Sequence, residues 1–203
     1  MEHAEAPWFV AVGASGAEGL GDLEELLGAL PAALPAVVLV VLHRPWDRIS
    51  RLRAVLAQAS AMPVIIARDG ERFEPGVAYI GEPAKHLTLA ARSLGELVHD
   101  PGRTHRGRTV DLLFRSVAEH GGKRVIGVVL SGSLDDGVRG LAAIHRAGGL
   151  TMVVTPHSGQ PWRGMPENAV AQDGSISVIG TPCEIANAIQ AAIRGAPGAT
   201  GPG

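Results

Sequence analysis

The sequence has little that would tie it to nucleic acid or to an oxidising compartment. Its 203 residues contain one cysteine, Cys183, so neither an intramolecular disulfide nor a cysteine-based zinc site can form. Aromatic residues make up 3% of the chain and the net charge is -2, which argues against base stacking and against a basic surface for nucleic acid. The cysteine usage favours a reducing compartment, and we expect a cytoplasmic protein.

Apolar runs long enough to span a membrane are also lacking. No stretch reaches the ~18 apolar residues that a membrane span needs. Residues 31–42 come closest, but two prolines interrupt them. The N-terminus has no basic region ahead of an apolar stretch, so it does not resemble a signal peptide. We therefore expect no membrane insertion.

The chain does have ample material for one α/β domain, since 46% of its residues are hydrophobic. Apolar strand patterns alternate with helical ones. Strands are predicted at 8–13, 36–42, 62–67, 77–80, 86–90, 95–98, 125–130, 150–154 and 175–179, and helices at 19–29, 48–60, 108–121, 136–147 and 182–194. The long Val, Ile and Leu runs do not alternate with polar residues. This pattern predicts a doubly wound, mostly parallel sheet with helices on both faces.

Two regions depart from this alternation. The short strands between 77 and 98 have no helix between them, which predicts an antiparallel hairpin at one edge of the sheet, with residues 93–95 in its turn. The last nine residues, 195–203, are rich in Gly and Pro and are predicted to be disordered. We therefore expect one folded domain over residues 1–194.

Three polar residues follow buried strands directly. Ser15 comes at the end of the first apolar run, His43 ends the second, and Asp136 lies just beyond the strand at 125–130. The carboxyl ends of parallel strands meet at one edge of a sheet, where α/β proteins place their sites. Ser, His and Asp at that edge would supply a nucleophile, a general base and the group that orients the base.

Each of these residues also has a structural interpretation. Ser15 suits a tight turn or a helix N-cap, and the amides after it, with Gly16, could bind a phosphate. The glycine spacing does not fit the dinucleotide fingerprint, and the P-loop lysine is missing. His43 could be a structural histidine, and Asp136 could cap the helix that follows it.

Two further segments have alternative interpretations. The loop with Arg103, His105, Arg106 and Arg108 could attract an acidic partner surface or could be a solvated loop. Residues 164–166 (GMP) could form the wall of a pocket or an ordinary turn.

A set of short motifs runs through nearly the whole chain, from about Val10 to about Ile193, and it is the order of the set that is specific. The motifs are 12–15 (VGAS), 42–45 (LHRP), 69–80 (DGERFEPGVAYI), 85–87 (KHL), 110–118 (VDLLFRSVA), 128–132 (VVLSG) with 136–137 (DG), and 164–166 (GMP). In this order they resemble the catalytic domain of the bacterial chemotaxis receptor methylesterases, the CheB type.

The resemblance implies a function. Enzymes of this kind hydrolyse glutamate γ-methyl esters on the cytoplasmic helices of methyl-accepting chemoreceptors, and many also deamidate receptor glutamines. By motif, Ser15 is the nucleophile, His43 the base and Asp136 the orienting acid. Neither a metal nor an organic cofactor is required.

The resemblance also places the residues around the reacting carbonyl. The backbone N–H groups near Gly16 and Ser133 would stabilise the oxyanion, and Met165 would lie beside the substrate.

The sequence departs from the family near the nucleophile. The run after Ser15 is one residue longer than usual and brings an acidic residue, Glu18, near the oxyanion. The Asp136 loop is also changed, with SGSLD at 131–135. Most family members carry an N-terminal phosphoreceiver domain, whereas Ser15 lies in the first strand here, so we expect no receiver to precede it.

These departures keep other functions open. The main alternative to an esterase is a catalytically weak or inactive CheB-like module that binds receptor helices or another signalling protein. A hydrolase of small esters and a phosphate-binding module at the turn of residues 16–21 are further alternatives.

Overall fold

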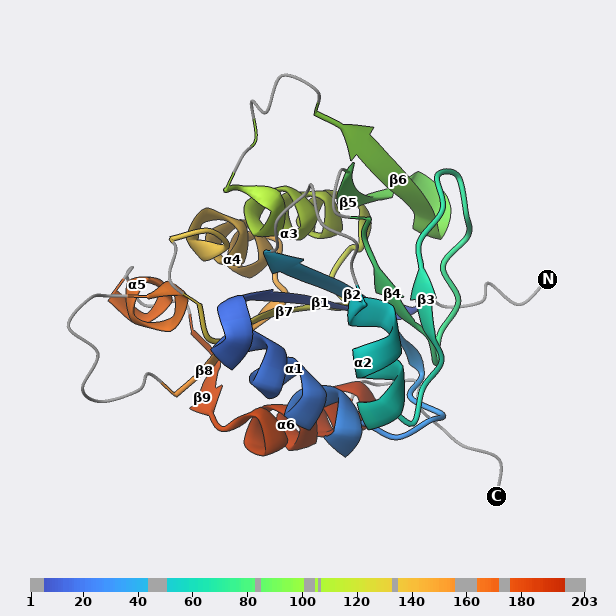
Figure 1. Cartoon of the computed structure of the whole chain (residues 1–203). Coiled ribbons are helices and arrows are strands. Elements are labelled where there is room, and N and C mark those ends of the chain that lie inside the picture. The colour runs from blue at the N-terminus through green and yellow to red at the C-terminus, as the bar shows by residue number, and fades with distance from the viewer. Residues whose placement is uncertain are drawn as a thin grey trace.

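The computed structural model describes residues 6–43, 51–82, 85–100, 105, 107–132, 135–155, 164–171 and 176–195 (Figure 1). Strands and helices alternate through most of the chain, as the sequence predicts. In chain order they are β1 (Trp8–Ser15), α1 (Gly16–Ala29), β2 (Ala36–His43), α2 (Leu52–Ala59), β3 (Val64–Ile66), β4 (Ala78–Ile80), β5 (Lys85–Ala90), a 3₁₀ turn (Ala91–Ser93), β6 (Leu94–His99), α3 (Thr109–His120), β7 (Val125–Val129), α4 (Val138–Arg146), β8 (Leu150–Val154), α5 (Met165–Ala171), β9 (Val178–Gly180) and α6 (Pro182–Gly195).

The main sheet has seven strands in the order β3-β4-β2-β1-β7-β8-β9, and every neighbouring pair is parallel. From β1 the chain first adds β2, β3 and β4 on one side, and later adds β7, β8 and β9 on the other. The predicted doubly wound sheet is thus confirmed. Ligand sites in such sheets lie at the carboxyl ends of the strands, where the direction of winding reverses. Here that place is the end of β1.

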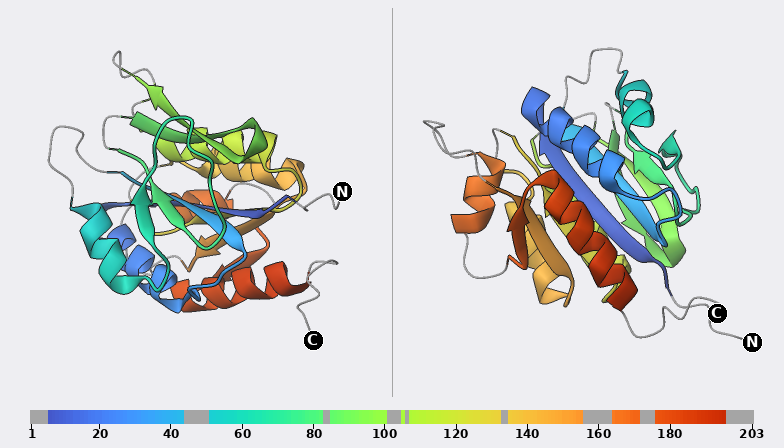
Figure 2. Two further views of the ribbon diagram at one scale, coloured as in Figure 1. Left: turned by 90° about the vertical axis from the view of Figure 1, so that its right-hand side faces the viewer. Right: turned by 90° about the horizontal axis from the view of Figure 1, so that it is seen from below.

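Helices cover both faces of the sheet (Figure 1). Alternate residues of β1 enter opposite cores: Val10 and Val12 pack with α1, α2 and α6, whereas Phe9 and Ala11 pack with α3, α4 and α5. The two cores explain why the long strands are apolar at every position. On the first face α1 and α6 lie side by side (Figure 2).

Helix α3 is the element whose sequence pattern predicts its packing best. Its apolar set of Val110, Leu113, Phe114 and Val117 is fully buried. The helix ends at His120, followed by the C-cap Gly121, as predicted. Its first turn packs directly on β1. A Cβ atom placed on Gly13 would lie 2.2 Å from Val110 Cγ1, so only glycine allows this approach.

The region between 77 and 98 differs in part from its prediction. Strand β4 joins the main sheet, where it runs parallel between β3 and β2, because its three buried residues fill both cores. Strands β5 and β6 do form an antiparallel hairpin, but as a separate two-stranded sheet over α3. The hairpin turn is Ala91–Ser93, and Leu94 and Gly95 are already paired in the strand.

Two other differences lie near the C-terminus. Helix α5 was not predicted; its seven residues are too few for a clear helical period in the sequence. Helix α6 extends to Gly195. The rest of the predicted disordered tail, 196–203, lies outside the described residues.

Candidate active site

Ser15 and His43 end neighbouring parallel strands in the same register. Ser15 of β1 pairs with His43 of β2, as the last pair of that ladder. Side chains alternate along a strand, and Ala11 and Leu39, in the same phase as the two end residues, lie in the core below α3 and α4. The strand geometry therefore directs the Ser15 and His43 side chains to the same face, side by side.

Ser15 lies at a tight turn from strand to helix. Its backbone is still extended, with φ -146° and ψ 142°, and helix α1 begins at the next residue. Gly16 makes the turn with φ +72°, a left-handed conformation that side chains rarely tolerate. Ser15 holds the N-cap position, as one interpretation of the sequence has it, but its side chain makes no capping hydrogen bond. The turn leaves the hydroxyl of the buried Ser15 beside the exposed Gly16.

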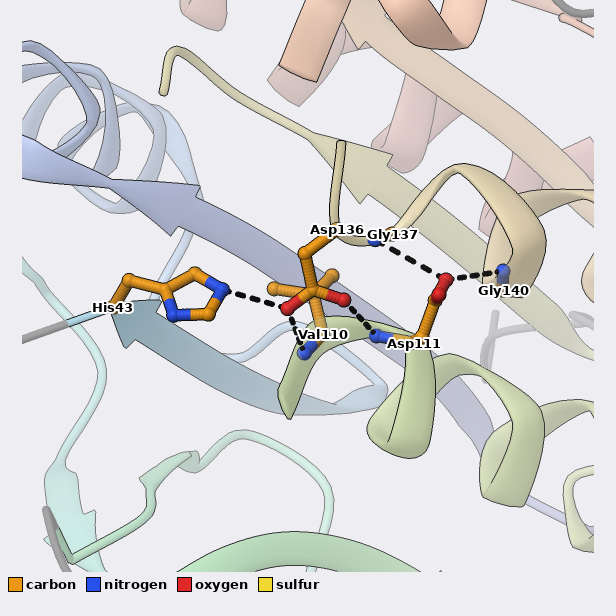
Figure 3. A network of polar contacts seen from close by, with 6 residues as sticks. All are labelled: His43, Val110, Asp111, Asp136, Gly137 and Gly140. Carbon is orange, nitrogen blue, oxygen red and sulfur yellow. Dashed lines mark hydrogen bonds and ion pairs between the residues drawn. The ribbon is translucent and has the colours of Figure 1, made fainter. Parts of the chain in front are cut away.

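His43 is held by Asp136. Its Nε2 atom lies 2.6 Å from Asp136 Oδ2, and the Asp136 side chain is fully buried (Figure 3). Because an ionised carboxylate can only accept a hydrogen bond, we assign the proton to Nε2 of the imidazole. Nδ1 is then the ring nitrogen with a free lone pair, and it can serve as a general base.

Asp136 is itself held by the first turn of α3. The backbone N–H of Val110 donates to Oδ2 at 2.8 Å, and that of Asp111 donates to Oδ1 at 2.8 Å. The first N–H groups of a helix have no partner within the helix, and Asp136 satisfies two of them at the start of α3. The alternative interpretation, that Asp136 caps the helix that follows it, is wrong, because α4 begins at the N-cap Gly137 with no side-chain capping bond. Asp136 caps α3, and another residue occupies the corresponding place at α4.

That residue is Asp111. Its Oδ1 atom accepts hydrogen bonds from Gly137 N at 3.1 Å and from Gly140 N at 2.7 Å, both at the start of α4 (Figure 3). Burial raises the pKa of the Asp111 carboxyl above its ordinary value, and the nearby charge of Asp136 raises it further, against the opposing hydrogen bond from Gly140. No chemical role for Asp111 is predicted from the sequence. The one signal in the sequence is its acidic side chain in the first turn of a predicted helix.

The chain is packed closely around the serine. Ser15 N donates to the carbonyl of Ser131 at 3.0 Å, which continues the β1–β7 contact beyond β7. A Cβ atom on Gly132 would lie 2.6 Å from both Ser15 Cβ and Met165 Sδ. Met165 is fully buried and donates its backbone N–H to Gly132 O at 2.8 Å. Its side chain thus packs beside the serine within the core rather than in solvent.

The remaining predicted residues are Glu18, Ser133 and the residues of the basic loop. Glu18 is exposed in the first turn of α1. Ser133, together with Arg103 and Arg106 of the basic loop, lies outside the described residues. Arg108 is exposed next to α3.

His105 connects the basic loop to the hairpin. Its backbone N–H donates to Asp100 Oδ2 at 2.7 Å, and His86 Nε2 lies 3.4 Å from the same oxygen. The His86 and His105 rings meet edge to face, with centroids 6.0 Å apart. Asp100 thus ties the start of the loop to β5.

The described residues hold neither a metal-binding cluster nor a membrane-spanning helix. They contain no group of three or more His, Cys, Asp or Glu side chains placed to bind a metal ion. In the same part of the chain, no helix combines the length and the hydrophobicity needed to cross a membrane.

Comparisons with known proteins agree on one family. The sequence model of the CheB methylesterase family matches residues 10–189. A protein-glutamate methylesterase/protein-glutamine glutaminase of Yersinia pestis is 37% identical over 174 residues, covering 84% of this chain and 49% of the relative. Protein-glutamate methylesterase/protein-glutamine glutaminase 3 of Anaeromyxobacter dehalogenans is 42% identical over 141 residues, covering 69% of this chain and 41% of the relative. The chain thus spans about half the length, or less, of these curated relatives.

A solved structure supports the same relationship. The crystal structure of the Thermotoga maritima CheB methylesterase catalytic domain matches with a TM-score of 0.81 and 25% sequence identity. The match covers 91% of this chain and 98% of that domain.

Proposed function

Since the chain belongs to the CheB methylesterase family, we propose that it is a protein-glutamate methylesterase that acts through Ser15, His43 and Asp136. The proposed substrates are glutamate γ-methyl esters on the cytoplasmic helices of chemoreceptors, with glutamine side chains as a second substrate. This proposal places the protein in the cytoplasm, where those helices lie. The observation that carries it is the bond between the half-buried His43 and the buried Asp136, beside the strand-paired Ser15.

The first half of the proposed reaction forms a covalent intermediate. Ser15 Oγ attacks the ester carbonyl while Nδ1 of His43 takes the hydroxyl proton. Asp136 keeps its hydrogen bond from Nε2 and stabilises the imidazolium that forms. When the tetrahedral intermediate collapses, the C–O bond to the methoxy group breaks, and His43 returns its proton to the departing methanol. The product on the enzyme is a glutamyl ester of Ser15.

The second half restores the enzyme. Nδ1 of His43 takes a proton from a water molecule, whose oxygen attacks the glutamyl-serine carbonyl. The bond to Ser15 Oγ then breaks, the serine regains its proton from His43, and the receptor glutamate leaves as the free acid. For a glutamine substrate the same steps release ammonia in place of methanol.

The start of α1 supports oxyanion stabilisation in this proposal. The backbone amides that follow Ser15 begin a 14-residue helix, whose positive end favours a developing negative charge. Each such donor can contribute roughly 3–4 kcal/mol to the transition state. The second proposed donor is the backbone N–H near Ser133. Glu18 is exposed, which lessens its opposition to the oxyanion through solvent screening.

The experiment that tests this function is methanol release from a methylated chemoreceptor cytoplasmic fragment. Wild type should release methanol and Ser15→Ala should not. Ser60→Ala is a matched control, because Ser60 follows α2 and its Oγ accepts a hydrogen bond from the nearby Met62 N. No release by a folded wild type that still binds the fragment would reject the esterase and support the binding module.

A further inference from the structure

Two aspartates lock the first turns of α3 and α4 together by exchanging caps. Asp136, just before α4, accepts the N–H groups of Val110 and Asp111 in α3. Asp111 in turn accepts the N–H groups of Gly137 and Gly140 in α4. Each carboxylate thus binds the helix that the other one belongs to or precedes (Figure 3).

The surrounding packing leaves this pair of turns little freedom. Gly137 has φ +95°, and a Cβ atom there would lie 2.8 Å from Val110 Cγ1. A Cβ atom on Gly140 would lie 2.5 Å from Phe114 Cβ. Both aspartates are buried, with 2% of Asp136 and 6% of Asp111 exposed. Asp111 therefore supplies two of the contacts that hold the turn at Asp136, together with this packing.

Both hydrogen bonds to Asp111 end on the same oxygen, Oδ1. A neutral amide carbonyl in that place could accept both of them. The arrangement thus needs a side chain of this length with an acceptor oxygen at its end, and it does not need a negative charge.

We propose that Asp111 is a positioning residue of the active site: it fixes the turn that carries Asp136, and thereby the orientation of the His43 imidazole. The inference rests on the proposed esterase function and extends it by one residue. Asp111 touches no reacting atom and acts through Asp136.

Three variants separate geometry from charge. Asp111→Asn keeps the acceptor and removes the charge, Asp111→Glu keeps the charge and displaces the acceptor by one methylene, and Asp111→Ala removes both. We expect Asp111→Asn to keep kcat for methanol release within about threefold. Asp111→Glu and Asp111→Ala should lose about 10- to 100-fold in kcat with little change in KM, as expected for a small misplacement of a catalytic group.

A spectroscopic readout keeps this test independent of the substrate. The Nε2–H proton of His43, bonded to Asp136, should give a downfield proton NMR signal, assigned by its loss in His43→Ala. The signal should persist in Asp111→Asn and shift or vanish in Asp111→Glu and Asp111→Ala. Glu184→Ala is the matched control, because it removes a capping carboxylate from Thr181 N at the start of α6, on the opposite face.

The outcomes are distinct. If Asp111→Ala keeps both the signal and kcat, or if Asp111→Asn loses as much as Asp111→Ala, the proposal is overturned. If Asp111→Ala does not fold, the other two variants decide the test. A loss of kcat in Asp111→Glu but not in Asp111→Asn supports the proposal, and equal kcat values in these two variants overturn it. If wild type releases no methanol while the signal follows the expected order, the positioning role is supported and only the proposed reaction fails.

Discussion

Ser15 and His43 are partners in a parallel ladder, at the last position where β1 and β2 pair. The strand pairing that builds the centre of the sheet therefore also sets the spacing of the proposed nucleophile and base. Neither residue depends on a long loop for its position. Such support by rigid elements is what a catalytic pair needs, because small displacements are costly in rate.

The His43–Asp136 bond predicts one tautomer of the histidine. Because Asp136 accepts from Nε2, the neutral imidazole should carry its proton there and leave Nδ1 bare. Nitrogen-15 chemical shifts of selectively labelled histidine distinguish the two tautomers. Asp136→Ala is the comparison and should yield a mixture. A wild-type spectrum with the proton on Nδ1 would contradict the arrangement.

Asp136→Asn should harm both stability and activity. Oδ2 accepts from His43 and Val110, and Oδ1 accepts from Asp111, so either orientation of an amide would set its NH₂ group against an N–H donor. We expect a loss of about 1–3 kcal/mol in unfolding free energy and about 10³- to 10⁴-fold in kcat.

Urea unfolding and methanol release measure these two effects. Asp69→Asn is the control, since Asp69 is exposed and its Oδ1 accepts from Leu97 N, which an amide oxygen can do equally well. Near-wild-type behaviour of Asp136→Asn would be incompatible with the contacts described.

Gly13→Ala should disturb the contact between β1 and α3. The new methyl group would lie 2.2 Å from Val110 Cγ1, and overpacking of this kind costs about 1–3 kcal/mol. Val110→Ala in the same chain should recover part of the loss, which a double-mutant cycle would quantify.

Gly21→Ala is the matched control for this substitution. Gly21 lies in α1 with open space around its would-be Cβ atom, so alanine there should stabilise by about 0.5–1 kcal/mol. If both substitutions change the stability equally, the close contact between Gly13 and Val110 does not determine which side chain position 13 tolerates.

Because the pKa of the Asp111 carboxyl is raised in the folded state, ionising this group lowers the free energy of unfolding. The carboxyl binds its proton more tightly when folded than when unfolded, so its contribution to stability is complete below its ordinary pKa of 3.8 and is lost as pH rises through the folded value. Asp111→Asn has no such loss. Its stability relative to wild type should therefore rise from pH 4 upward and then level off. Urea unfolding from pH 4 to 8 tests this, and a constant difference would refute it.

The strand ends, more than any local motif, predicted which residues the sheet brings together at the candidate site. Ser15 and His43 follow uniformly apolar runs, and such runs mark parallel strands whose carboxyl ends share an edge. The bond between His43 and Asp136 then follows from their common location, although 93 residues separate them.

Other features could not be predicted because their causes are not local. Asp111 looks like an ordinary first-turn acid in a helix, and only the packing of α3 on α4 shows its partners, Gly137 and Gly140, more than 20 residues away. Likewise β4 is a three-residue strand whose parallel pairing depends on the core that receives it, and α5 is too short to show its period.

The exchanged caps of α3 and α4 also connect the proposed catalytic site to local unfolding. The amide hydrogens of Val110, Asp111, Gly137 and Gly140 are all engaged by the two aspartates, so any opening that separates the two helices releases all four to solvent exchange together. The same opening frees Asp136 from its place beside His43. When the helix pair opens without the rest of the domain, the free energy of that opening sets the fraction of molecules in which Asp136 holds His43.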